Sequence, residues 1–325
     1  MRRVSWSILT GLGVFFIVLA ILSKFFVPGQ AVKFPLNQYS TTTLRADNAS
    51  YFSPSTVNEE SGVTLEAVST TKGDVAAAKS IDSNNVAVWQ SYTAIEDITN
   101  HQAVSIPADG NTLAFDRKTG VLIPWSGNAV AGKHVEISGT EQGPLFPLST
   151  EKKNYQVFDS TLQKPVTFSF KGTSTTAGIS TYVFTADIPP TQTGTQSLPG
   201  ELVGEKASEV TLPEFYSVKE TYFVDPVTGV PLKVEQNVQQ TLQDSTGTTR
   251  LVLMSADFKT TPASIASGAA TDKDGRTKIT VLNVIIPIVA GVIGLILLII
   301  GLVLSQFRPE DEEYEDEDEF VGVPA

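Results

Sequence analysis

The longest run without a charged residue is Ile279–Phe307, which ends at Arg308. As an α-helix its 29 residues would extend roughly 43 Å, and about 20 apolar residues already cross a bilayer. The run is apolar on every face, whereas a surface helix of a soluble protein has one polar face. The pattern therefore predicts a transmembrane helix over 279–307.

A second apolar run, Ile8–Leu22, follows Arg2 and Arg3 and extends to Val27. A charged start before an apolar stretch is typical of a secretory signal. The residues after the run are bulky, and no small-x-small cleavage site is well placed. We therefore expect an uncleaved signal anchor over residues 8–27, with removal by a signal peptidase as the alternative.

The two helices predict a two-pass plasma-membrane protein with both termini in the cytoplasm. Arg2 and Arg3 place the amino terminus inside by the positive-inside rule. Lys273, Arg276 and Lys278 favour the opposite orientation, but the first helix usually dominates. The predicted parts are a cytoplasmic amino terminus (1–7), the first helix (8–27), an extracytoplasmic domain (28–278), the second helix (279–307) and a disordered, acidic cytoplasmic tail (308–325).

Small residues provide a candidate packing face on each helix. Ala290, Gly294 and Gly301 share one side of the second helix, and Gly13 and Ala20 lie seven positions apart on the first. Small residues let helix backbones approach closely in lipid, although they are also common in membrane helices for other reasons.

Pro287 interrupts the hydrogen bonding of the second helix. Proline has no N–H, so the carbonyl of Asn283, four residues earlier, loses its helical donor. We expect a kink near Pro287 and a carbonyl that needs another partner within the membrane.

Between the helices, stretches rich in Val, Thr, Tyr and Phe predict a mainly β domain. Several alternate apolar and polar residues, as half-buried strands do. The expected strands are Gly62–Lys72, Val86–Ile98, Gln156–Asp159, Pro165–Lys171, Ile179–Ala186, Phe215–Val224, Pro231–Leu242 and Leu251–Lys259. The fold class is a large antiparallel β domain, either a sandwich or barrel-like, flanked by the two transmembrane helices.

One short motif, D-x-x-T-G-V, occurs twice, at Asp116–Val121 and at Asp225–Val230. Asp would cap its own turn, and Gly would take the left-handed conformation of a type I turn with a bulge. Phosphate binding is disfavoured, since no Gly-rich loop or following helix accompanies the motif.

Two segments are predicted to be connections, with a possible short helix before the second. Ile188–Pro213 is rich in Pro, Gly, Thr and Ser and predicts a long surface loop. Ser264–Ala270 could form a short helix, and Thr271–Lys278 predicts a polar juncture before the membrane.

Composition narrows the chemistry that this chain can perform. The formal net charge is −12, and nine acidic residues in Glu310–Glu319 account for all but −3 of it. No large basic surface is implied, so nucleic acid is not an expected partner. The chain has no Cys and only two His, which leaves few ligands for a soft metal and no disulfides; no metal or cofactor is expected.

No common catalytic motif is present, so we expect a protein that is not an enzyme. His101 and His134 are the only histidines. Either could act as a base if folding placed a Ser or a carboxylate beside it, but a solvated loop histidine is the favoured interpretation.

Three sequence stretches resemble the actinobacterial PorA-like "porin" family. They are Gly143–Asp159 (GPLFPLSTEKKNYQVFD), Gly178–Phe184 (GISTYVF) and Tyr222–Gly229 (YFVDPVTG). The resemblance implies two membrane helices around a β-rich external domain, in bacteria with a mycolic-acid envelope. It also implies association with envelope assembly and mycolate glycolipids.

Three non-catalytic functions follow from this plan. The leading hypothesis is an envelope-assembly protein whose external domain binds lipid or glycolipid beside a lipid transporter, since β folds can enclose an apolar cavity. The alternatives are a membrane scaffold for an envelope complex, or a pore-forming protein, as the family label suggests. An envelope hydrolase is the least favoured.

Overall fold

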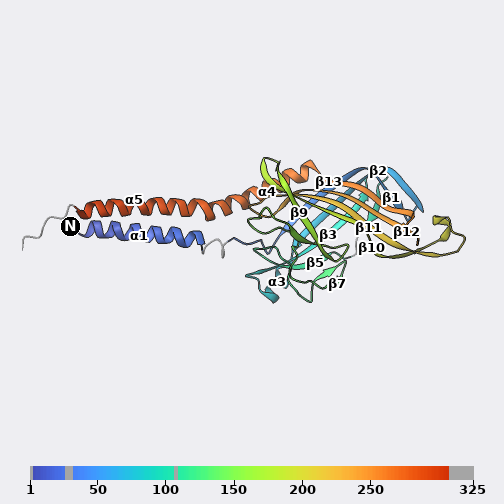
Figure 1. The fold of residues 1–325 in the computed structure, drawn as a ribbon, viewed down its shortest axis with the longest axis horizontal. Helices are drawn as coiled ribbons and strands as arrows, with labels where there is room; N and C mark the ends of the chain where they lie inside the picture. The colour runs from blue at the N-terminus through green and yellow to red at the C-terminus, as the bar shows by residue number, and fades with distance from the viewer. Residues whose placement is uncertain (1–2, 26–31, 106–108, 307–325) are drawn as a thin grey trace, which may run out of the picture. The chain divides into compact units, whose positions relative to one another are not determined.

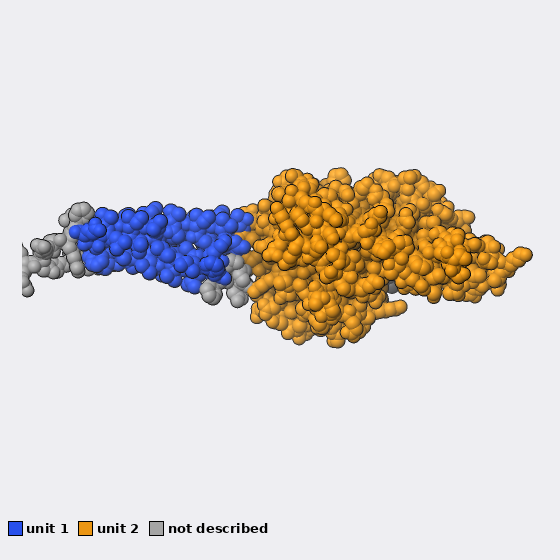
Figure 2. Space-filling model, viewed as in Figure 1, with its two compact units in different colours: residues 1–28, 280–325 blue, residues 29–279 orange. Residues whose placement is uncertain are grey.

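The computed structural model describes residues 3–25, 32–105 and 109–306, which form two compact units (Figure 2). Unit 1 comprises residues 1–28 and 280–325, and unit 2 comprises residues 29–279. The predicted acidic tail, 308–325, lies outside the described residues, as do the predicted helix ends at 26–27 and 307.

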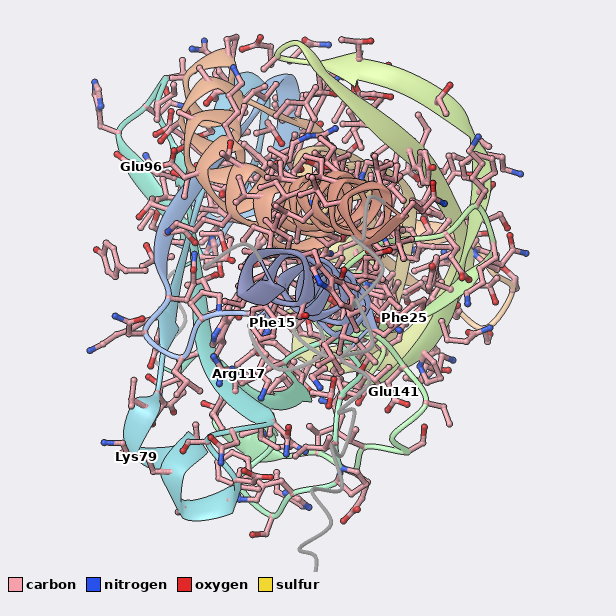
Figure 3. All side chains as sticks on the ribbon, turned by 90° about the vertical axis from the view of Figure 1, so that its left-hand side faces the viewer. Phe15, Phe25, Lys79, Glu96, Arg117 and Glu141 are labelled. Carbon is pink, nitrogen blue, oxygen red and sulfur yellow. The ribbon has the colours of Figure 1, made fainter. Side chains whose placement is uncertain are left out.

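Unit 1 is a pair of helices, α1 (Arg3–Phe25) and α5 (Ile286–Gln306), which lie side by side (Figure 1). A π-helical turn, η2 (Val281–Ile285), precedes α5. Both helices are long and apolar enough to cross a membrane. Their outer faces are apolar, as Phe15 and Phe25 of α1 illustrate with exposed fractions of 57% and 75% (Figure 3).

Unit 2 is mainly β, as predicted. The described residues contain thirteen strands in one antiparallel sheet, with the order β7-β6-β5-β3-β2-β1-β13-β12-β11-β10-β9-β8 and β4 beside β3. The strands are β1 (Tyr39–Ser53), β2 (Asn58–Gly73), β3 (Val86–Asp97), β4 (Gln102–Ser105), β5 (Asn111–Asp116), β6 (Ala129–Val130), β7 (Lys133–His134), β8 (Tyr155–Asp159), β9 (Lys164–Thr176), β10 (Ile179–Leu198), β11 (Val210–Val224), β12 (Pro231–Gln243) and β13 (Thr249–Thr260).

Isolated bridges link β5, near one end of this strand order, to β8 at the other end. Leu122 pairs with Phe115 of β5, Val121 pairs with Gln142, and Gln142 pairs with Val157 of β8. Alternate side chains of the long strands are buried, which places the apolar set on one face of the sheet. That face is packed with rings, for example Phe146 stacked on Phe184 at 4.7 Å between centroids.

Both D-x-x-T-G-V motifs form the predicted turns. Gly120 and Gly229 have φ values of 70° and 72°, in the left-handed region that glycine tolerates. The carboxylates of Asp116 and Asp225 accept backbone N–H groups within their own turns. The second turn joins β11 to β12, and the first connects β5 to the bridge at Leu122.

A single segment, Gly143–Ser149, is hydrogen-bonded to both turns. In each turn it donates to the carbonyls at the third and fifth positions of the motif. The four bonds run from Gly143 to Gly120 (2.8 Å), Leu148 to Lys118 (3.1 Å), Phe146 to Gly229 (2.9 Å) and Ser149 to Val227 (3.1 Å). The repeated motif therefore provides two equivalent docking points for one extended segment.

The prediction of a long surface loop over Ile188–Pro213 is wrong. Strand β10 continues to Leu198, a short 3-10 helix, η1 (Gly200–Val203), follows, and β11 begins at Val210. Thr-rich stretches suit a pleated strand, and Pro189 and Pro190 occupy an irregularity in the β10–β11 pairing, where proline is tolerated.

Helix is more extensive than predicted before the membrane segment. The juncture Thr271–Lys278 belongs to α4 (Pro262–Thr280), which also contains the expected short helix. The sequence pattern also missed β1, β4 to β7 and the short helix α3 (Val75–Ile81). Helix α4 has no apolar stripe to signal it, because both its faces are largely polar or small.

Candidate functional site

Glycines bring α1 and α5 into backbone contact within unit 1. A Cβ placed on Gly13 would lie 2.6 Å from the nitrogen of Leu298 and 2.9 Å from the oxygen of Gly294. A Cβ on Gly294 would lie 2.8 Å from the nitrogen of Ile17, and one on Gly301 would lie 2.8 Å from the nitrogen of Thr10. Any larger residue at these positions would force the helices apart.

The structure places the other two candidate packing residues at or near this interface. Ala290 is buried, and the Cβ of Ala20 would lie 3.7 Å from a Cβ on Gly291. Sequence reasoning missed Gly291 and Thr10, which contribute to the same contact. Their spacing could have identified them, since each lies three residues before a predicted glycine, at Gly294 and Gly13.

The carbonyl that Pro287 leaves without a helical donor is satisfied by the other helix. Lys24 Nζ of α1 donates to the oxygen of Asn283 at 3.1 Å. The backbone N–H of Ile286 instead reaches Val281, five residues back, which produces the π turn. A basic side chain at the end of α1 thus replaces a bond that proline removes from the neighbouring helix.

In unit 2, helix α4 is clamped to the second D-x-x-T-G-V turn. Arg276 Nη1 donates to both oxygens of Asp225, at 2.8 and 2.9 Å, and Asp225 is fully buried. Thr228 Oγ1 donates to Asp272 Oδ1 at 2.5 Å. One turn of the sheet therefore holds two successive turns of α4 through two separate carboxylates.

Asp272 is the most strongly perturbed group of this clamp. Its pKa is raised from 3.8 to about 7, first by burial and then by the neighbouring Asp225 carboxylate, while Thr228 and Arg276 act in the opposite direction. Its second oxygen, Oδ2, is buried with no hydrogen-bond partner among the described residues. A proton on Asp272 would reduce the repulsion between the two carboxylates.

A second buried carboxyl lies on the packed face of the sheet. Glu220 of β11 accepts a hydrogen bond from Gln236 of β12 and one from the hydroxyl of Tyr222 at 3.5 Å. Burial raises its pKa to about 7, with a further contribution from Asp159. Because Gln236 lies on the neighbouring strand, its bond to Glu220 links β11 to β12.

The two histidines occupy exposed positions, His101 in a turn and His134 in strand β7. His101 lies between β3 and β4 with a φ of 55°. His134 has both ring nitrogens occupied, Nδ1 by the carbonyl of Asn128 and Nε2 by Glu136 Oε1, each at 3.0 Å. The bond to Glu136 raises the pKa of His134. Neither arrangement presents a free base beside a serine hydroxyl.

The described part of the chain offers few places for a ligand. It contains no group of three or more His, Cys, Asp or Glu side chains that could hold a metal ion. Two open surface hollows have volumes of about 270 and 180 Å³. The first is lined by charged and polar residues such as Arg45, Asp47 and Lys259, and the second mainly by Gln, Thr and Ser side chains.

Paired apolar helices and an antiparallel β unit define the class as a β-rich membrane protein. The chain belongs to the family described as Porin PorA, whose model matches residues 7–303. The match extends from α1 through most of α5, so it includes both units. None of the curated proteins compared with the chain matches it.

Proposed function

We infer that the protein is a membrane-anchored, non-enzymatic scaffold for a cell-envelope complex. The observation that carries this proposal is the filled packed face of the sheet, where Phe146, Tyr155, Phe184 and their neighbours contact one another. A solid β body on a paired-helix anchor presents surfaces rather than a reaction chamber. Partner recognition then falls to the exterior of unit 2, because the small-residue face of α5 already contacts α1.

The alternative is a protein that binds lipid or glycolipid, including mycolate-type ligands, beside a transporter. That function would need an apolar site large enough for the ligand. Ligand pockets are typically about 300–1,000 Å³ and mostly apolar. The aromatic side chains that suggested such a pocket form ring pairs in the core, and the two hollows described above are lined largely by polar side chains. These observations favour the scaffold over the lipid-binding protein.

Pore formation is the second candidate, and the family description favours it. The lipid-compatible surface of this chain is on its two helices, whereas the exposed residues of β1 and β12 include many polar side chains. A pore would therefore require several copies assembled through their helices. Purified protein should then conduct ions in planar bilayers.

The proposed location is the plasma membrane, with unit 2 outside and both termini in the cytoplasm. Protease added to intact cells should digest unit 2 and spare an epitope placed after residue 325. Digestion of the epitope with unit 2 intact would reverse this orientation.

The scaffold itself is tested by native mass spectrometry of the full chain extracted from membranes in mild detergent. We expect complexes larger than one chain, without a stoichiometric lipid that exchanges with added lipid. A single chain that carries one exchangeable lipid would overturn the scaffold in favour of lipid binding.

A further inference from the structure

Among the described residues, the outer half of β10 is hydrogen-bonded to a neighbouring strand on one side only. Residues Ile179–Thr185 pair with β9 on one side and Tyr182–Leu198 pair with β11 on the other, so from Ala186 onward only β11 is hydrogen-bonded to β10. All six residues of Gln192–Ser197 are exposed, on both faces of the strand. The β10–β11 pair forms a projecting arm of unit 2 (Figure 1).

This edge has no charged side chains to oppose pairing with another strand, although the β10–β11 register shifts at Thr193, between Gln192 and Gly194. Natural edges are commonly blunted by charged side chains, yet Ile188–Gly200 contains none. Pro189 and Pro190 protect only the start of the free stretch. Beyond them, Gln192 Nε2 reaches along the strand to the oxygen of Gly194 at 3.3 Å, so a side chain partners a backbone acceptor there.

The sequence of the free edge reads almost the same in both directions around Gly194. Thr193 mirrors Thr195, Gln192 mirrors Gln196, and Thr191 mirrors Ser197; Pro189 and Pro199 are equally distant from the centre. Antiparallel pairing of two copies about Gly194 would place each residue opposite its mirror partner. Cross-strand Thr–Thr and Thr–Ser pairs stabilise sheets, and no like charges would meet in the paired stretch.

We propose that two copies of this chain associate through antiparallel pairing of Thr191–Ser197, centred on Gly194, to join their sheets across a twofold axis. Such a contact is isologous, since each copy contributes the same surface. The seven residues span about 23 Å, the length of an ordinary strand. This inference rests on the proposed scaffold function and names a second copy as its partner.

A cysteine at the centre of the edge tests the pairing directly, because the natural chain has no Cys. A Cβ on Gly194 would meet nothing within 4 Å, so Gly194→Cys should fold normally. Oxidation of this variant in the full chain, in nanodiscs or native membranes, should yield a covalent dimer. The control is Ser80→Cys on the exposed face of α3, which should not form a covalent dimer. Equal cross-linking of the two variants, or none at Gly194, would overturn the pairing.

A charge-swap experiment separates pairing from a general effect on folding. Thr193→Lys with Thr195→Lys places like charges opposite each other in a homodimer and should abolish it. Mixing that variant with Thr193→Glu/Thr195→Glu should restore a heterodimer, whereas damaged folding would not be rescued. Failure of rescue would contradict the inference, and retention of larger complexes in both variants would leave the scaffold function intact. Capture of a different extended protein segment along β10 would equally rule out self-pairing.

Discussion

Thr119 and Thr228 occupy the same position in the two D-x-x-T-G-V turns but donate to different carboxylates. Thr119 Oγ1 bonds to Asp116 Oδ1 of its own turn at 2.9 Å, whereas Thr228 Oγ1 bonds to Asp272 of α4. In the first turn the threonine hydroxyl bonds within the turn. In the second turn it bonds to helix α4. Arg276 then binds the second turn's own Asp225. The threonine of this repeated motif thus makes a tertiary contact in one copy only.

The two threonines should therefore respond differently to the same substitution. Thr228→Val removes the hydroxyl that donates to the buried carboxyl of Asp272. The free energy of unfolding should fall by about 1–3 kcal/mol. Thr119→Val alters an exposed turn and should cost about 0.5 kcal/mol. Thermal unfolding of the two full-length variants in detergent provides the comparison. Equal losses would contradict a special role for the Thr228–Asp272 contact.

Asp272 should make the stability of unit 2 pH-dependent. Its pKa rises from 3.8 to about 7 on folding, so between these values the folded state holds a proton that the unfolded state releases. Stability from this group is therefore present below about pH 4 and is lost as the pH rises to about 7. Asp272→Asn should flatten this part of the stability profile and make the variant more stable than the natural protein at pH 8.

Two further variants check the assignment to Asp272. Asp274→Asn changes an exposed carboxyl two residues away and should leave the pH profile unchanged. Glu220 also has a pKa raised to about 7, so Glu220→Gln should remove a separate part of the same slope. An Asp272→Asn profile that matches the natural protein would show that the proton is held elsewhere.

Gly294→Leu should separate α1 from α5. Its side chain would meet the backbone of Ile17 and Gly13, and overpacking of this kind typically costs about 1–3 kcal/mol. A disulfide reporter is available, because Ala20→Cys and Gly291→Cys would place two Cβ atoms about 3.7 Å apart, within the range for an S–S bond. The reporter should close in the natural background and remain open with Gly294→Leu.

Gly11→Leu is the matched control for that experiment. Gly11 also lies on α1, but a Cβ there would meet nothing within 4 Å. The reporter disulfide should therefore form normally in this variant. Loss of the disulfide in both leucine variants would mean that added bulk, rather than the contact at Gly294, controls the pairing.

Lys24 and Pro287 should behave as a coupled pair. Lys24→Met leaves the carbonyl of Asn283 without its donor and should weaken the helix pair by about 1 kcal/mol. Pro287→Ala restores a backbone N–H that can bond to the same carbonyl, so Lys24→Met should cost much less in that background. A double-mutant cycle that uses the reporter disulfide measures this coupling. Additive effects would argue against the replacement of one bond by the other.

Features that depend on local composition could be read from the sequence. A charge-free run longer than a bilayer is thick predicts a membrane-spanning helix whatever surrounds it, and α5 is such a helix. D-x-x-T-G-V predicts its turn because Asp and Gly act within a few residues of each other. Pro287 likewise indicated which carbonyl would lack a donor, since that loss is a property of the helix itself.

Only the tertiary structure decided which distant groups complete these local features. Lys24 reaches Asn283, Thr228 donates to Asp272, and residues 188–198 continue β10 because β11 lies beside them. Propensity cannot identify such partners, because hydrogen bonds between distant segments form only when the whole sheet or helix pair assembles. Weakly patterned segments such as α4 therefore take their conformation from the neighbours that folding provides.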